Sequence, residues 1–425
     1  MNASNLEICA TVIFFLAIIH TFLVSKFAKI AHSYPDGSIG ENFFHYLAEI
    51  EAVFGIWSLL FLVIMIFQIG YPESIHYVES LNFTEPAFVF VIMAMAATKP
   101  VVNLAENLII KASKLIPLPG KMAFFLTVMV LGPLVGSFIT EPAAMTVTAL
   151  ILLKYFFSKN MSSKFKYAAI GLLFVNVSIG GTLSHFAAPP VLMVAGKWGW
   201  GFGHMFTHFG YKGALACITS ALLITFYFRK ELTGPLKIEA KDPKVMNVPI
   251  WATVIHLVFL ALVVITAHHM VIFIGLFLFF LGFTSVTKEF QESIKIKESL
   301  MVGFFLAGLI ILGTPQKWWL QPLIANLSDT VLFFGTTGLT ALTDNAALTY
   351  LGSLVELTDS AKYYLLAGAV TGGGLTVIAN APNPAGYGIL KASFEEGSIS
   401  PLGILKGALI PTIVAILCFG LLPTL

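Results

Sequence analysis

Charged residues are scarce in this chain, and arginine is almost absent. Asp, Glu, Lys and Arg make up 11% of its 425 residues, whereas soluble proteins carry roughly 25%. This deficit excludes an ordinary water-soluble domain. The single arginine, Arg229, leaves no guanidinium fork within the apolar segments to bind a carboxylate or a phosphate.

Cysteine pairs and nucleotide motifs are also missing. Cys9, Cys217 and Cys418 stand alone in apolar segments, so no pair has the spacing of a metal or redox site. The chain has no glycine-rich phosphate loop followed by Lys-Ser or Lys-Thr, so we expect no bound ATP and no cofactor. The lysines lie in short loops, which argues against nucleic acid as a partner. A nucleophile–base set is absent too, so we do not expect an enzyme.

Long apolar runs dominate what is present. The chain is 57% hydrophobic, with a mean hydropathy of +0.89, and its runs of about 17–25 residues are each long enough to cross a bilayer. We therefore predict an all-α polytopic membrane protein whose first run is a retained span rather than a signal peptide. The predicted spans cover 7–25, 44–70, 84–110, 166–199, 210–228, 248–267, 268–286, 298–313, 361–393 and 401–422.

Two apolar segments do not read as simple spans. Residues 122–157 and 319–357 are interrupted midway by Thr140-Glu-Pro142 and by Thr343-Asp-Asn345. Each half is short for a crossing, so we predict two re-entrant hairpins. Polar, non-helical backbone at membrane depth requires surrounding protein or water.

These polar interruptions belong to an internal repeat. The segment 138–152 matches 341–355, and each copy holds one carboxylate two residues before Ala-Ala. Gly180-Gly-Thr-Leu-Ser-His-Phe-Ala-Ala-Pro-Pro190 likewise matches Gly372-Gly-Gly-Leu-Thr-Val-Ile-Ala-Asn-Ala-Pro382. The glycines allow close backbone approach and the prolines break helices. We predict broken helices at 166–199 and 361–393, a pattern typical of secondary transporters.

Lysine distribution supports the same layout. The loops 26–29, 111–121, 159–166, 229–244 and 288–297 are rich in Lys, so we expect them in the cytoplasm and both chain ends outside. Each copy has five crossings and one hairpin. Because five is an odd number, we expect the second copy to be inverted in the membrane relative to the first. We predict a first inverted repeat at 1–229, a cytoplasmic connector at 230–247 and a second inverted repeat at 248–425.

Glu141 and Asp344 are the leading candidates for chemistry. A carboxylate deep in a bilayer costs several kcal/mol, so such residues are rare and usually functional. We expect these two to exchange protons for a cation, although an ion pair or a role in the hairpin tip would also account for them. Further oxygen ligands suited to an alkali cation are available on Thr140, Thr182, Ser184, Thr343, Asn345, Thr376, Asn380 and Asn383.

Two other ionisable positions allow more than one interpretation. His185, inside the first break, is either a pH sensor or a hydrogen-bonded packing histidine. Lys99 and Glu106 are seven residues apart, and this spacing indicates first a buried structural pair and second a part in the ion path.

At these residues the chain resembles the ion transporter superfamily of divalent-anion symporters, arsenite permeases and sodium/proton antiporters. Thr343-Asp344-Asn345 is similar to the acid-plus-amide tip of the antiporter and arsenite branches, and neither tip has the Ser-Asn-Thr of the dicarboxylate branch. The resemblance implies a homodimer in a bacterial inner membrane, with 122–200 and 319–393 moving as an elevator. It also implies that sodium binds mainly in the second repeat, with Asp344 and Asn380 among its ligands.

The leading functional hypothesis is exchange of sodium, or lithium, for protons. Protons and the cation would compete for Asp344, with Glu141 as the second titrating group. The alternative is a sodium- or proton-coupled transporter of an anion such as a dicarboxylate or arsenite, because helix ends can bind anions without arginine.

Overall fold

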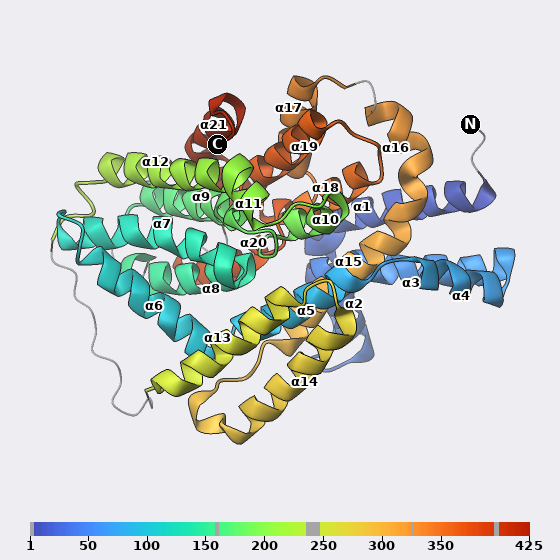
Figure 1. The fold of residues 1–425 in the computed structure, drawn as a ribbon, viewed down its shortest axis with the longest axis horizontal. Coiled ribbons are helices and arrows are strands. Elements are labelled where there is room, and N and C mark those ends of the chain that lie inside the picture. Colours follow the sequence, from blue (N-terminus) through green and yellow to red (C-terminus); the bar gives the residue numbers. More distant parts are fainter. Residues whose placement is uncertain (1–3, 158–160, 235–246, 325–326, 395–398) are drawn as a thin grey trace. The chain divides into compact units, whose positions relative to one another are not determined.

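All regular structure in the described part of the chain is helical, as its composition predicts. The computed structural model describes residues 4–157, 161–234, 247–324, 327–394 and 399–425, and Figure 1 shows their helices. Most of the predicted connector, at 235–246, lies outside the described residues. The chain divides by its internal packing into a first unit, at 1–90, 296–328 and 350–358, and a second unit that contains the rest.

The first unit is built mainly from helices of the N-terminal quarter. Its helices are α1 (Asn5–Ala31), α2 (Ile39–Leu47), α3 (Val53–Ile69), α4 (Tyr71–Ser80), α15 (Ile296–Gly313) and α16 (Lys317–Ile324), with 3₁₀ turns at Ile50–Ala52 and Thr314–Gln316. The helix α3 packs on both α1 and α15. Phe54 joins the three, because its ring lies 5.6 Å from that of Phe14 and 5.2 Å from that of Phe305.

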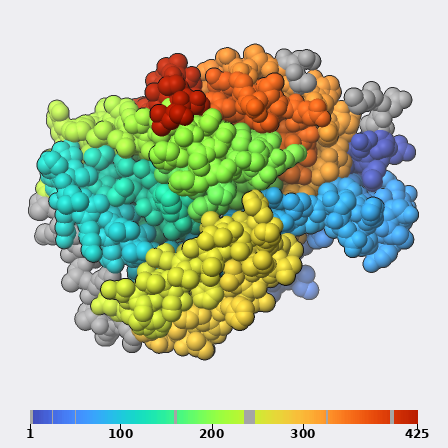
Figure 2. All heavy atoms as spheres, in the orientation of Figure 1, coloured from blue at the N-terminus to red at the C-terminus, as the bar shows by residue number. Residues whose placement is uncertain are grey.

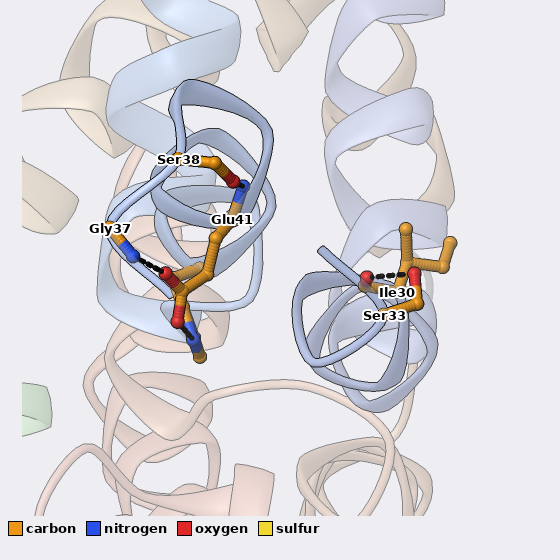
Figure 3. A network of polar contacts seen from close by, with 6 residues as sticks. Ile30, Ser33, Gly37, Ser38 and Glu41 are labelled. Carbon is orange, nitrogen blue, oxygen red and sulfur yellow. Dashed lines mark hydrogen bonds and ion pairs between the residues drawn. The ribbon is translucent and has the colours of Figure 1, made fainter. Parts of the chain in front are cut away.

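Local hydrogen bonds explain the turn between α1 and α2 (Figure 3). Ser38 precedes α2, and its hydroxyl accepts a hydrogen bond from the backbone N–H of Glu41 at 3.1 Å. The Glu41 carboxylate accepts in turn from the backbone N–H of Gly37, and Gly37 has φ +76°, a value that favours glycine. Ser33 donates to the Ile30 carbonyl at the end of α1. These bonds satisfy backbone groups that the helix ends leave free.

The second unit holds both copies of the repeated motifs. Two helices begin or end across the division between the units, α5 (Thr84–Ala96) and α18 (Asn345–Ser353). The other helices of the second unit are α6 (Lys99–Ser113), α7 (Gly120–Ile139), α8 (Glu141–Leu152), α9 (Ser163–Gly180), α10 (Pro189–Trp198), α11 (Phe202–Met205), α12 (Tyr211–Tyr227), α13 (Ile250–Ile265), α14 (Met270–Val286), α17 (Asp329–Thr340), α19 (Asp359–Gly372), α20 (Asn383–Leu390) and α21 (Pro401–Leu421).

Within the second unit, α9 lies against α7, α12 and α21, while α17 packs along α19 and α20 along α8. Figure 1 shows α7, α9 and α12 side by side. Phenylalanine rings pack between α7 and α9, with Phe125 of α7 5.2 Å from both Phe156 and Phe165. Burial of these rings supplies the apolar packing that holds the second unit together.

Exposed apolar side chains cover parts of the same unit. On α13 and α14, which lie side by side in Figure 2, Ile250 is 83% exposed, Val271 is 86% exposed and Phe279 is 75% exposed. Large exposed apolar surfaces indicate contact with lipid or protein. Six described helical stretches are long and apolar enough to cross a membrane, and they are Asn5–Val24, Gly120–Ile139, Ser163–Leu183, Phe202–Tyr227, Ile296–Ile324 and Pro401–Leu421. The chain is therefore an integral membrane protein.

Four predicted boundaries were wrong. The single span expected at 44–70 is divided, because α2 ends at Leu47 and α3 begins only at Val53, after a 3₁₀ turn. The single span expected at 84–110 is two helices, because Thr98 is extended and Pro100, in the first turn of α6, has no N–H to continue α5. The stretch between the spans predicted at 44–70 and 84–110 was expected to be a loop but contains α4, which meets α5 at a bend of 61°. The loop expected at 200–210 is helical, since α11 and a π-helical turn continue directly into α12.

The predicted interruptions lie where expected. In the segment 122–157, α7 ends at Ile139 and α8 begins at Glu141. The expectation that each half is short for a crossing is wrong for α7, which at 20 residues is long and apolar enough to cross a membrane. The segment 319–357 contains most of α16 as well as α17 and α18, so it has three helices rather than two halves. Both 166–199 and 361–393 are broken, with short 3₁₀ turns at Gly181–Leu183 and Val377–Ala379 between their helices.

Candidate functional site

The first acid begins a helix inside the second unit. Thr140 has extended backbone, and its hydroxyl accepts from the Ala143 N–H at 3.4 Å. Glu141 starts α8, and Pro142 takes a first-turn position where no N–H is needed. Glu141 is completely buried, and its backbone N–H donates to the Ala187 carbonyl, which lies in the first break. The first acid and the first break are therefore directly joined.

The first break is stabilised by hydroxyl groups. Ser137 donates to the Gly180 carbonyl at 2.5 Å and accepts from the Leu183 N–H at 3.0 Å. Thr182 is buried, and its hydroxyl bonds back to Ile179 at 2.7 Å. Ser184 is buried as well, and its hydroxyl has no hydrogen-bond partner among the described residues. Helix ends leave backbone groups that need such partners.

The second acid caps a helix. Asp344 is partly buried, and its Oδ1 accepts from the backbone N–H groups of Ala346 at 2.8 Å and Ala347 at 3.2 Å, as an N-cap carboxylate does. Thr343 beside it is also partly buried, whereas Asn345 is fully buried. Asn345 contacts Ser178 near the end of α9, and Gly181, directly after α9, lies against Glu141 Oε1. The structure thus brings the two acids of the repeat to one region.

The second break is held by asparagine and threonine. Asn383 Nδ2 donates to the carbonyls of Gly373 at 2.7 Å and Thr376 at 2.9 Å. The Thr376 hydroxyl donates to the Ala341 carbonyl at 2.9 Å, which joins this break to the end of α17. These two bonds link the first residue of α20 to the segment that follows α19.

One hydrogen bond connects the two copies of the motif. Asn380, from the second break, donates from Nδ2 to Glu141 Oε2 at 3.0 Å, and both residues are buried. Glu141 begins α8 and Asn380 shortly precedes α20, and these two helices pack side by side (Figure 1). Sequence reasoning named both residues but placed the main cation site within the second repeat, and it did not foresee this bond.

Several oxygen atoms at these motifs are buried without a hydrogen-bond partner among the described residues. In each of the three asparagines the nitrogen donates to the protein, so the amide oxygen is the unpaired atom. Among the predicted site residues, the unpaired carboxylate and amide oxygens are Glu141 Oε1, Asn345 Oδ1, Asn380 Oδ1 and Asn383 Oδ1. Buried polar atoms are normally satisfied, and carboxylate and amide oxygens are ligands that hard cations prefer. This donor set is suited to a small hard cation.

The described residues offer no comparable set of ligands for a transition metal. In the ranges that the structure describes, no group of three or more His, Cys, Asp or Glu side chains is placed to hold a metal ion. His185 is partly exposed, its ring lies 5.4 Å from that of Phe186, and its Nδ1 has no partner in the described part of the chain. Its two interpretations, sensor and packing residue, both stay predictions.

Sequence reasoning missed Ser178, and it did not foresee which atoms two of the repeated glycines approach. Ser178 donates to the Val370 carbonyl at 2.8 Å and contacts Asn345 Nδ2 at 3.5 Å. A methyl group at Gly181 would overlap Glu141 Oε1, and one at Gly373 would overlap Ser178 Oγ. The repeated Gly-Gly pairs signalled close backbone approach, but an isolated serine in an apolar helix carried no signal.

The expected pair of Lys99 and Glu106 is wrong. Lys99 begins α6, and its ammonium lies 3.9 Å from the carboxylate of Glu292. Seven residues of helix separate Lys99 from Glu106 by about 10 Å along the axis, and Glu292 lies closer in space.

Comparison with known families agrees with this chemistry. A family model described as "Putative Na+/H+ antiporter" matches residues 5–422. No curated protein matches the chain closely enough to serve as a relative. Because the match covers nearly every residue, the chain belongs to this putative Na+/H+ antiporter family.

Proposed function

We propose that the protein exchanges sodium, or lithium, for protons, with Glu141 and Asp344 as the groups that release and take up protons. The observation that carries the proposal is the Asn380–Glu141 hydrogen bond. It joins the two motif copies while leaving Glu141 Oε1 and Asn380 Oδ1 buried without partners in the described residues. A carboxylate and a carbonyl in this arrangement can bind a cation, or the carboxylate can bind a proton.

Competition for one site explains the coupling. A bound sodium ion needs the ionised carboxylates, and protons remove that charge, so the site holds either protons or the cation. The empty form has two ionised carboxylates and no bound cation, and moving its net negative charge through a bilayer is costly. Exchange therefore proceeds without a separate gate.

The remaining polar residues then act as ligands or as supports. Asn345, Asn380 and Asn383 supply amide oxygens to the sodium ion, and Asp344 supplies a carboxylate. Thr343 and Ser184 offer hydroxyl groups near the tips and breaks. The hydroxyls of Thr140, Thr182 and Thr376 already bond to backbone groups, so these residues support the cation site through the backbone.

Inverted repeats account for several contacts in the second unit. In the alignment of the breaks, Ser178 corresponds to Val370, and these two residues contact each other. Equivalent residues of two copies contact each other where a two-fold axis passes between them. This contact therefore supports a pseudo-two-fold axis that relates the two repeats. Ser137 contacts Gly180 in the first copy, and a methyl group at Gly372 would press on the corresponding Thr340 in the second copy.

The repeats give the transport mechanism a moving part. We place the re-entrant hairpins and the broken helices in an elevator, and add α12 and α21 because both pack on α9. The protein acts as a homodimer in a bacterial inner membrane, with both chain ends outside. In this proposal the dimer contact holds the static part in place while the moving part carries the cation site across the membrane.

Fewer observations support anion transport than support sodium/proton exchange. Arg229, the single arginine, is exposed at the end of α12, so no arginine lies among the motif residues to bind a dicarboxylate. The family comparison points to cation exchange.

Proteoliposomes with an internal pH dye and an imposed proton gradient test the proposal. Sodium, lithium, potassium, succinate and arsenite are added in turn to wild type, to Asp344→Asn and to Asp359→Asn. Sodium or lithium should dissipate the gradient in wild type and in Asp359→Asn, whose carboxylate is exposed and pairs with Lys362. Asp344→Asn should not respond. Wild-type exchange in Asp344→Asn, or a response to the anions alone, would contradict the proposal.

A further inference from the structure

The second unit buries one acid and one base completely. Among the described residues, Glu141 is the only Asp or Glu in the buried class, with no exposed surface, and Lys212 is the only Lys or Arg, with 2% exposed. Lys212 lies on α12, outside both motif copies. Burying either charge is costly, so the presence of both in one unit requires an explanation.

The two charges do not form an ion pair. Glu141 accepts from Asn380, whereas Lys212 Nζ donates to the Tyr363 hydroxyl on α19 at 2.7 Å. The Tyr363 hydroxyl donates in turn to the Phe419 carbonyl, at 2.7 Å, near the end of α21. The partners of the ammonium are thus neutral.

Aromatic rings complete the surroundings of Lys212. Its Nζ lies 4.5 Å from the centre of the Tyr363 ring and 5.9 Å from that of Tyr211. Ring faces and a phenolic oxygen stabilise an ammonium ion in place of water. Such surroundings hold a positive charge but supply no negative charge to cancel it.

Lys212 belongs to the part of the unit that contacts the motifs. Its neighbour Gly213 packs so closely on the first break that a methyl group there would overlap Ile179 O and approach Thr182 Oγ1. Because Tyr363 lies on α19, the same lysine also contacts the helix that leads into the second break. Any movement that carries the breaks across the membrane therefore carries the charge of Lys212 with them.

We propose that Lys212 is a resident counter-charge that decides which half of the exchange cycle moves net charge. This inference rests on the proposed function. With both carboxylates ionised and one monovalent cation bound, the ammonium of Lys212 makes the set neutral. With both carboxylates protonated, the same set carries one positive charge. Without the ammonium, the cation-loaded set carries one negative charge and the protonated set is neutral.

Sodium-for-sodium exchange isolates the cation-loaded half of the cycle. Proteoliposomes loaded with sodium take up radiolabelled sodium while valinomycin and a potassium gradient set the membrane potential. Wild type, Lys212→Arg and Lys99→Met should exchange at rates independent of potential. Lys99→Met is the matched control, because it removes a lysine that pairs with Glu292.

The neutral variants Lys212→Met and Lys212→Gln should become voltage-sensitive. If the transition state lies halfway through the field, 100 mV should change their exchange rate about sevenfold. Lys212→Gln keeps a donor for Tyr363, so it tests the charge even if Lys212→Met does not fold. Size-exclusion chromatography identifies a folded variant.

Two results would overturn the inference. One is voltage-independent exchange in a folded neutral variant, and the other is voltage-dependent sodium-for-sodium exchange in wild type. Both leave wild-type sodium/proton exchange intact, which the pH dye measures in the same vesicles. Absence of sodium/proton exchange in wild type would instead contradict the proposed function. Failure of the Lys212 inference and failure of the proposed function are therefore distinguishable.

Discussion

The side-chain amide of Asn380 donates a hydrogen bond of 3.0 Å to the carboxylate of Glu141, although 239 residues separate them in the chain. Both residues are buried, and each belongs to a different copy of the repeated motif. The bond orients the amide so that its oxygen, like Glu141 Oε1, has no partner in the described residues.

Asn380→Ala should destabilise the protein and weaken cation binding. The substitution removes the donor to Glu141 Oε2, and an unsatisfied buried group costs about 1–3 kcal/mol. Thermal unfolding of the purified protein should show a lower Tm, and the KM for sodium should rise. Asn42→Ala, at an exposed position of α2, is the control and should change neither. An unchanged Tm and KM in Asn380→Ala would show that the bond is unimportant.

Glu141→Gln should separate stability from transport. Glutamine has nearly the shape of glutamate, and its oxygen can still accept from Asn380 Nδ2. We therefore expect a Tm at or above that of wild type, since no carboxylate is buried. Sodium-driven proton movement should nevertheless be lost, because an amide cannot release a proton. Full exchange activity in Glu141→Gln would assign Glu141 a purely structural role.

Substitutions of Asp344 should differ in stability but not in activity. Asparagine can accept the bonds from Ala346 and Ala347, so Asp344→Asn should unfold near the wild-type Tm. Asp344→Ala removes the cap of α18 and should cost about 1 kcal/mol. Both should lose exchange. Equal Tm values for the two variants would mean that the cap contributes nothing measurable.

Gly181→Ala and Gly373→Ala should each disrupt the site. The added methyl group would overlap Glu141 Oε1 in the first case and Ser178 Oγ in the second, and overpacking costs about 1–3 kcal/mol. A lower Tm and reduced sodium exchange are expected for both. Gly388→Ala on α20 is the control, because nothing lies within 4 Å of the added carbon. A similar Tm for all three variants would contradict the close approach.

Features that depend on local sequence could be predicted well. The long apolar runs predicted a helical membrane protein, and Glu141 and Asp344 were chosen as candidate site residues because a carboxylate is rare in such runs. The helix interruptions followed from proline, which lacks an N–H, and from paired glycines. The same local rules failed at 84–110, where Thr98 and Pro100 together end one helix and begin another.

The sequence did not predict which residues far apart in the chain contact each other. The spacing of Lys99 and Glu106 suggested a partner on the same helix, yet Glu292 lies closer in space. Ser178, inside an apolar helix, had no pattern to mark it, and its contact with Val370 depends on how α9 meets α19.

By itself, the sequence determined the class of protein, the positions of the two candidate acids and the places where the helices break. These properties depend on residue type and near neighbours along the chain. Only the tertiary structure decided that Asn380 bonds to Glu141 and that Lys212 bonds to Tyr363. The physical reason is that helix packing, which follows from the combined shapes of many side chains, selects which distant polar groups meet.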